Sequence, residues 1–148
     1  MRKIVLAPWL GVALLCLVAA KPPSLPVLGQ PLPAAGEALA GRRQLEQAGA
    51  VVRQYQTPRG VTLRAYAGSN GVVFGLAWQG VAPPDLEQLL GSHYAAYRAQ
   101  AEGARRRGPV TIKAGDLVVQ LGGHMRDLRG RAYLASAIPA QLSPAVVR

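Results

Sequence analysis

A β-hairpin is predicted by the stretch Gly60-Val-Thr-Leu-Arg-Ala-Tyr-Ala-Gly-Ser-Asn-Gly-Val-Val-Phe-Gly-Leu-Ala-Trp78. Its middle carries Asn70-Gly71, a dipeptide suited to a two-residue type I′ turn, and moving the loop to Ser69-Asn70 leaves both faces the same. One face of the ladder is then wholly apolar, with the expected pairs Leu63 with Trp78, Ala65 with Leu76 and Ala67 with Phe74. The other face is mixed, with the pairs Tyr66 with Gly75, Arg64 with Ala77 and Thr62 with Gln79. We expect the apolar face to be buried and the mixed face to meet solvent or a partner.

The composition is that of one basic domain. The chain has 148 residues, about half of them apolar, which is enough for one core and short for two. Its net charge is +10, and removal of Arg2 and Lys3 with a leader leaves 15 basic against 7 acidic residues, or +8. Such an excess favours anionic partners, whether nucleic acid, anionic lipid or acidic polysaccharide, without choosing among them.

Residues 1–20 have the form of a secretory signal peptide. Met1-Arg2-Lys3 supplies a basic start, an apolar run follows, and Val18-Ala19-Ala20 offers the small residues of a cleavage site. We expect cleavage after Ala20 and a periplasmic or secreted location. Two alternatives stay open: an uncleaved membrane anchor, although the run is shorter than the roughly 20 residues of a spanning helix, and a lipoprotein anchored at Cys16. This residue is the only cysteine, so a mature chain without it has no disulfide.

Residues 21–45 are predicted to be a flexible, proline-rich segment. Lys21 to Pro33 contains five prolines, which fix φ and remove backbone donors, so it should form an extended tether. A short, weakly packed helix is predicted around Leu39 to Ala48, where the residues are good helix formers. We therefore place a single folded domain at residues 46–148, beginning near a predicted strand from Ala50 to Gln56.

An amphipathic helix is predicted from Asp85 to Glu102. Its apolar face is formed by residues at helical spacing: Leu86, Leu89, Leu90, His93, Tyr94 and Tyr97. The apolar face of the hairpin is the natural packing partner of this helix. Gly91 lowers the helix propensity at its middle and indicates a close approach to a strand or a slight break.

A second hairpin is predicted near the C-terminus. Its strands are Asp116 to Leu121 and Arg126 to Leu134, joined by Gly122-Gly123-His124-Met125, in which the two glycines suit a tight turn. Residues 136–148 contain two prolines and are expected to be irregular. The predicted fold class is α+β: a small antiparallel sheet built on β-hairpins, with one main amphipathic helix packed on a face.

Three segments together resemble a known family. They are Gly71-Val-Val-Phe-Gly-Leu-Ala-Trp-Gln-Gly80, Pro84-Asp-Leu-Glu-Gln-Leu-Leu-Gly-Ser-His93, and Asp116-Leu-Val-Val-Gln-Leu-Gly-Gly-His-Met-Arg126 with Gly130-Arg-Ala-Tyr-Leu134. In order and spacing they are similar to small exported proteobacterial proteins catalogued as domain of unknown function 2844. The resemblance covers roughly Val51 to Arg148. It implies export and a shared fold, and it brings no activity, ligand or catalytic residue with it.

Candidate ligand-binding residues come from two places. They are His124, Arg126, Asp127, Arg64 and Tyr66. The first three lie in or beside the Gly-rich turn, where the backbone lets a ligand approach and an imidazole can bind an anion. The other two are polar members of the mixed hairpin face. Neither histidine has metal-ligand spacing, and no phosphate loop, dinucleotide fingerprint or nucleophile elbow occurs, so we expect no metal and no cofactor.

Two functions from different classes are consistent with these residues. We favour a noncatalytic exported protein that binds an anionic component of the envelope or an envelope protein, because histidines and carboxylates are sparse. The alternative is a small hydrolase or transferase that uses His124 with Asp127 or Asp116. No specific nucleic-acid binding is expected, since stacking aromatics are missing around Arg105-Arg106-Arg107. Membrane contact is expected only through an uncleaved signal.

Overall fold

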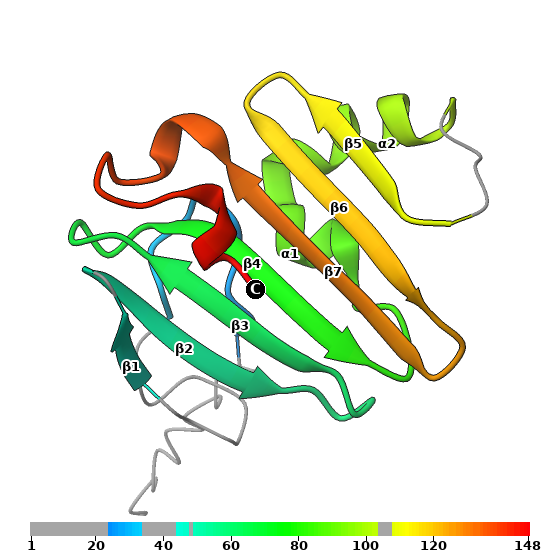
Figure 1. Ribbon diagram of the computed structural model, residues 1–148, viewed down its shortest axis with the longest axis horizontal. Helices are drawn as coiled ribbons and strands as arrows, with labels where there is room; N and C mark the ends of the chain where they lie inside the picture. Colours follow the sequence, from blue (N-terminus) through cyan, green and yellow to red (C-terminus); the bar gives the residue numbers. More distant parts are fainter. Residues whose placement is uncertain (1–23, 34–43, 48, 104–107) are drawn as a thin grey trace, which may run out of the picture.

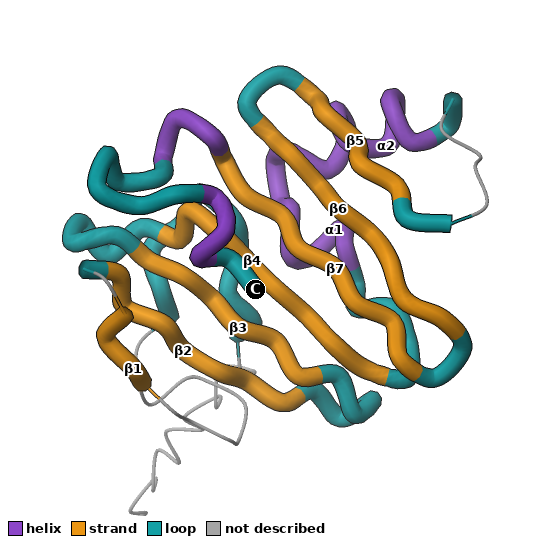
Figure 2. The backbone as a smooth tube through the Cα atoms, viewed as in Figure 1, coloured by secondary structure: helices purple, strands orange, loops and turns teal. Residues whose placement is uncertain are grey.

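The chain folds into one antiparallel sheet with helices on one face, which confirms the predicted α+β class (Figure 1; Figure 2). This computed structural model describes residues 24–33, 44–47, 49–103 and 108–148. The sheet has seven strands in the order β1-β2-β3-β4-β7-β6-β5. The strands are β1 (Gln44–Gln47), β2 (Ala50–Gln56), β3 (Thr62–Ala67), β4 (Val73–Gly80), β5 (Val110–Ala114), β6 (Leu117–His124) and β7 (Asp127–Leu134). The predicted signal peptide and the Arg105-Arg106-Arg107 run lie outside the described residues.

The predicted amphipathic helix exists as two pieces. They are α1 (Leu86–Leu90) and α2 (Tyr94–Ala101), joined by a 3-10 turn. Gly91 has a φ of 52°, and a Cβ on it would lie 2.7 Å from Cγ1 of Val27. The helix therefore breaks where a side chain has no room, and the close approach is to the N-terminal segment rather than to a strand.

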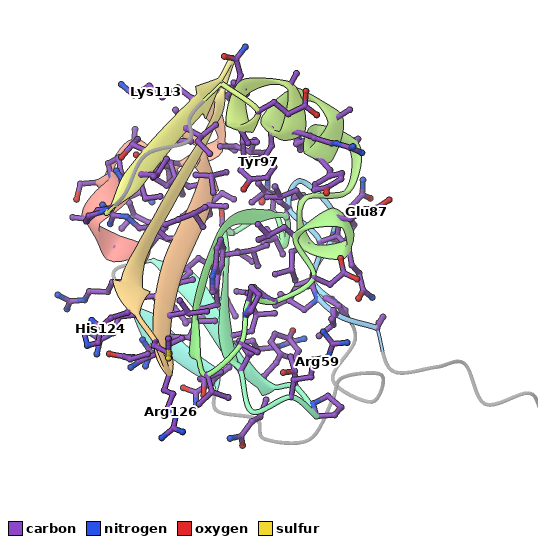
Figure 3. The ribbon with its side chains drawn as sticks, turned by 90° about the vertical axis from the view of Figure 1, so that its right-hand side faces the viewer. Arg59, Glu87, Tyr97, Lys113, His124 and Arg126 are labelled. Carbon is purple, nitrogen blue, oxygen red and sulfur yellow. The ribbon has the colours of Figure 1, made fainter. Side chains whose placement is uncertain are left out.

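Both faces of the sheet carry buried apolar residues. The larger cluster lies under the helices and includes Leu63, Leu76, Trp78, Leu89 and Leu90. The smaller cluster lies on the opposite face and includes Tyr66, Phe74, Tyr133 and Val147. Figure 1 shows the end of the chain crossing in front of the sheet while α1 and α2 lie behind it, and Figure 3 shows the same layers from the side. We refer to residues 135–148 as the C-terminal segment.

The central hairpin has the predicted register up to its last pair. Leu63 lies opposite Trp78, and Ala65 lies opposite Leu76. The expected pairing of Ala67 with Phe74 is wrong, because a β-bulge between Tyr66 and Ala67 places Ala67 opposite Val73. A bulge sets two residues of one strand against one of the other, so the alternation of faces shifts by one residue. Phe74 consequently packs in the smaller cluster, and its predicted place against the helix is wrong.

The N-terminal segment differs from the predicted flexible tether. Leu28 is 1% exposed and belongs to the cluster under the helices. Its N–H donates to the main-chain oxygen of Leu89 at 2.8 Å, and Pro31 forms an isolated bridge with Val72. Prolines remove donors, but the residues between them still bond to the helix and to the central hairpin. Residues 24–33 are therefore part of the folded domain, which begins earlier than residue 46.

Two further parts of the chain differ from the sequence predictions. Where a helix was expected around Leu39 to Ala48, Gln44–Gln47 is the edge strand β1, paired with β2. Sheet pairing thus overrides local helix propensity there. At the other edge of the sheet, Val110–Ala114 forms β5, a strand that no sequence pattern above identified.

The turn between β6 and β7 is formed by Met125 and Arg126, not by the two glycines. His124 pairs with Asp127, while Gly122 and Gly123 lie within β6. The predicted glycine turn is wrong because the observed register sets Val119 opposite Ala132, so that apolar side chains of both strands share the face under the helices. Arg126 takes the positive φ that the turn requires, at 71°.

Candidate functional site: an arginine groove

The sheet face opposite the helices is built from three cross-strand rows. Neighbours in one row lie on β3, β4, β7 and β6 in that order. The rows are Tyr66, Gly75, Tyr133 and Val118; then Arg64, Ala77, Arg131 and Gln120; then Thr62, Gln79, Arg129 and Gly122. The C-terminal segment covers the first row, and the second and third rows form an open hollow. We call this hollow, of about 650 Å³, the arginine groove.

The groove is hollow because its floor is made of small residues. Ala77 lies between Arg64 and Arg131 in the second row, and Gly122 ends the third row. A Cβ added to Gly122 would meet nothing within 4 Å, so the space above it is open. Strands lie about 4.8 Å apart, which sets the Cα atoms of Arg64 and Arg131 about 10 Å from each other across β4. Long basic side chains therefore stand on either side of a low floor.

The open end of the groove carries an ion pair. Arg129 donates from Nη2 to Oδ2 of Asp127 at 2.8 Å and from Nε to the same oxygen at 3.1 Å. Gln79 donates from Nε2 to Oδ1 of Asp127 at 2.9 Å. The hydrogen bonds from Arg129 and Gln79 lower the pKa of the Asp127 carboxyl from its ordinary value. The Asp127 carboxylate is thus charged at neutral pH and already accepts hydrogen bonds from two side chains.

The closed end of the groove is formed by the C-terminal segment. Arg131 donates from Nη1 to the main-chain oxygen of Val147 at 3.0 Å, and Arg64 donates from Nη1 to that of Arg148 at 3.0 Å. The Tyr66 hydroxyl donates to the main-chain oxygen of Arg148 at 2.5 Å. Val147 itself is fully buried. The predicted irregular tail is therefore a packed element, held by side chains of the sheet.

The structure divides the predicted site residues between the groove and the turn beyond it. Arg64 lines the groove, Tyr66 closes one end, and Asp127 lies at the other end. His124 pairs with Asp127 across the ladder, and Arg126 lies in the turn; Figure 3 shows both at the lower end of the molecule. These five residues do not form one compact site.

Sequence reasoning missed two groove arginines, Arg129 and Arg131. They alternate with Leu128 and Gly130 along β7, so the period of two puts both on one face. Their pairing opposite Gln79 and Ala77 could not be read from the chain, because β7 joins β4 across a long sequence separation. The alternating Arg-x-Arg was the signal available.

The structure separates one of the predicted catalytic pairs. His124 and Asp116 flank opposite ends of β6, roughly 25 Å apart at the rise of a strand. Asp116 instead accepts hydrogen bonds from the main-chain N–H and the hydroxyl of Ser136, at 2.7 and 2.6 Å. His93, the other histidine, is partly buried near Gly29. Within the described ranges, no group of three His, Cys, Asp or Glu side chains is placed to hold a metal ion.

Fold and groove together define a class of protein: a single antiparallel sheet, helical on one side, with a cationic hollow on the other. A family model described as protein of unknown function (DUF2844) matches residues 26–147, so the chain belongs to that family. Searches of the curated proteins and of the solved structures found no match. In the part of the chain that the structure describes, no helix is both long and apolar enough to span a membrane.

Proposed function

We propose that this is an exported, noncatalytic protein that binds an anionic component of the cell envelope in the arginine groove. The observation that carries the proposal is the convergence of Arg64, Arg129 and Arg131 from two strands around a floor of small residues. A guanidinium group presents several N–H donors in a planar fork that matches carboxylate and phosphate oxygens. Each of the three arginines already donates within the protein: Arg64 to Arg148, Arg129 to Asp127, and Arg131 to Gln120 and Val147. A guanidinium group has five N–H groups, so each arginine keeps further donors for a ligand.

The groove is suited to binding more than to catalysis. Its polar side chains are arginines, glutamines and one threonine, and none of them is an effective general base near neutral pH. The carboxylate at its open end is engaged by Arg129 and Gln79. The catalytic alternative, a hydrolase or transferase that uses His124 with Asp127, depends on a carboxylate that already has these two partners.

Removal of two groove arginines should weaken anion binding. We use tripolyphosphate as the probe, titrated by calorimetry into the wild type and into the Arg64→Gln, Arg129→Gln double variant. Each charge-assisted hydrogen bond is worth about 1.5 to 3 kcal/mol, so the loss of affinity should be about tenfold or more. Binding by the wild type should also weaken as the salt concentration rises.

The matched control removes the same number of positive charges from outside the groove. The Arg98→Gln, Lys113→Gln double variant removes two exposed cationic side chains that do not line the groove. Equal loss of affinity in both double variants would show that net charge, rather than the groove, binds the probe. Unchanged binding in the groove variant would contradict the proposal, and turnover of an added ester or phosphoester that disappears in His124→Ala would favour the catalytic alternative.

Export is the second part of the proposal, and it predicts the N-terminus of the mature protein. Cleavage after Ala20 removes none of the residues that pack in the described fold, and the family match begins later, at residue 26. We expect intact-mass measurement of protein recovered from the periplasm of a bacterial host to give a chain that starts at Lys21. An intact Met1 in the membrane fraction would show that the segment is an anchor, and a start within residues 26–33 would show that the assigned cleavage site is wrong.

A further inference from the structure

We propose that the turn end of the sheet contacts the surface of an anionic lipid bilayer, with Met125 entering the headgroup region. By the turn end we mean the β6–β7 turn together with Val81 and Arg59. Met125 is 90% exposed and Val81 is 61% exposed, and they are the large hydrophobic side chains that stand out from the described surface. This inference goes beyond the groove and does not depend on what the groove binds.

The two exposed apolar residues lie at the same end of the sheet. Val81 directly follows β4, whose last residue, Gly80, pairs with Leu128 of β7. Met125 lies in the turn that leads into β7, just beyond the pair of His124 with Asp127. In Figure 1 the end of β4 and the β6–β7 turn are neighbours at the lower right. Both apolar side chains therefore project from one narrow edge of the molecule rather than from scattered sites.

Two exposed arginines lie at the same end of the sheet as these apolar residues. Arg126 is exposed at the tip beside Met125, and Arg59 is exposed in the turn between β2 and β3. Figure 3 shows all three labelled side chains Arg59, His124 and Arg126 in the lower part of the molecule, with Arg59 on the other side from His124 and Arg126. The carboxylate next to them, Asp127, is held by Arg129 and Gln79 and so is compensated. An apolar tip at the same end of the molecule as two exposed arginines matches the interface of a bilayer that exposes anionic headgroups.

The shape of this end favours a lipid surface over a protein partner. Stable protein interfaces need broad, complementary patches of roughly 800 Å² on each partner. Here the exposed apolar surface is one methionine in a projecting turn and one neighbouring valine, which is too small for such an interface but suited to shallow insertion. The contact would be weak and reversible, and it would hold the open end of the arginine groove toward the membrane.

The experiment measures partitioning of the full exported protein onto vesicles by cosedimentation. Vesicles of phosphatidylglycerol and phosphatidylethanolamine serve as the anionic probe, and phosphatidylcholine vesicles serve as the neutral one. We expect binding to the anionic vesicles only, reduced about tenfold by Met125→Ser and about fivefold by Arg126→Asn. Asparagine tolerates the positive φ at position 126, so this variant removes the charge without straining the turn.

A second readout reports insertion directly. In Met125→Trp, the tryptophan added at the tip should shift its emission to shorter wavelength when anionic vesicles are added, measured as a difference from the parent protein. Ser69→Trp is the matched control, because Ser69 is exposed in the β3–β4 turn at the opposite end of the sheet. Its emission should not change. Equal shifts at both positions, or no shift at Met125→Trp, would overturn the proposal.

The groove variant separates this inference from the proposed function. Arg64→Gln changes the groove and leaves the Arg129–Asp127 pair beside the turn end intact. Vesicle binding that is lost in Arg64→Gln but kept in Met125→Ser and Arg126→Asn would mean that the groove, not the turn end, engages the lipid, and the inference would be wrong. Vesicle binding that is lost only in the turn variants would support it even if tripolyphosphate does not bind the groove. Thermal melts of each variant confirm that the fold is intact.

Discussion

Phe74→Ala should lower the free energy of unfolding by about 3 to 5 kcal/mol. Phe74 is 1% exposed, and its ring centroid lies 6.4 Å from that of Tyr66 in the smaller apolar cluster. Its removal leaves a cavity between the sheet and the C-terminal segment, which can collapse only if that segment moves. The measurement is equilibrium unfolding in urea, followed by circular dichroism. A loss below about 1 kcal/mol, typical of an exposed position, would contradict the observed burial.

A pair of double-mutant cycles tests on which face of the sheet Phe74 lies. Val147 belongs to the same cluster, whereas Leu89 belongs to the cluster under the helices. We expect Phe74→Ala to couple with Val147→Ala by about 0.5 to 3 kcal/mol and to add to Leu89→Ala within about 0.5 kcal/mol. The reverse result would place Phe74 against the helix, as simple alternation along the strand predicts. The cycles therefore test the β-bulge itself.

Gly123→Val should cost about 3 kcal/mol or more, by the same unfolding measurement. Gly123 has a φ of 99°, and a Cβ there would lie 2.1 Å from the main-chain oxygen of Asp127. A left-handed backbone costs other residues about 1 to 2 kcal/mol, and overpacking costs about 1 to 3 kcal/mol more. The obstructing atom belongs to the backbone of β7, so no side-chain rotation relieves the contact.

The neighbouring positions supply matched controls. Gly122 has no positive φ and open space above it, so Gly122→Val should change stability by no more than about 0.5 kcal/mol. His124→Ala should be similarly mild, because His124 is exposed. Equal losses at both glycines would show that glycine itself, rather than the contact at Gly123, is required. A stable His124→Ala protein that fails to rescue a deletion phenotype would make His124 a functional residue.

The central hairpin shows how far local patterns predict structure. Its pairs from Thr62 with Gln79 to Tyr66 with Gly75 follow from period-two alternation and a short turn, both of which act between near neighbours in the chain. The predicted pair of Ala67 with Phe74 does not form, because a β-bulge moves one residue to the other face of the sheet. No feature of the local pattern distinguishes a strand with this bulge from one without it. The same limit applies to Gly122 and Gly123, where the turn was placed on the glycines although apolar pairing of β6 with β7 decides the register.

The candidate site was predictable only in part. Arg64 and Tyr66 were identified because they share the mixed face of a hairpin whose register is local. Arg129 and Arg131 were missed, because their place beside that face depends on the pairing of β7 with β4. Along the chain these two strands are separated by both helices and by β5 and β6. His124 and Arg126 were chosen as candidates because they lie beside the two glycines, and the structure places both residues beyond the groove.

By itself, the sequence determined the α+β class, the hairpin register as far as the pair of Tyr66 with Gly75, the helical segment after the hairpin and the excess of positive charge. These depend on turn chemistry, on the period of apolar residues and on composition, all of which act locally or need no geometry. Only the tertiary structure decided where the charge is gathered and what covers each face. Arg64 and Arg131 flank one groove because β4 lies between their strands, and Leu28 and Val147 are buried because segments with little local preference fill the two faces of the sheet. Such contacts join residues far apart in the chain, and no local pattern encodes them.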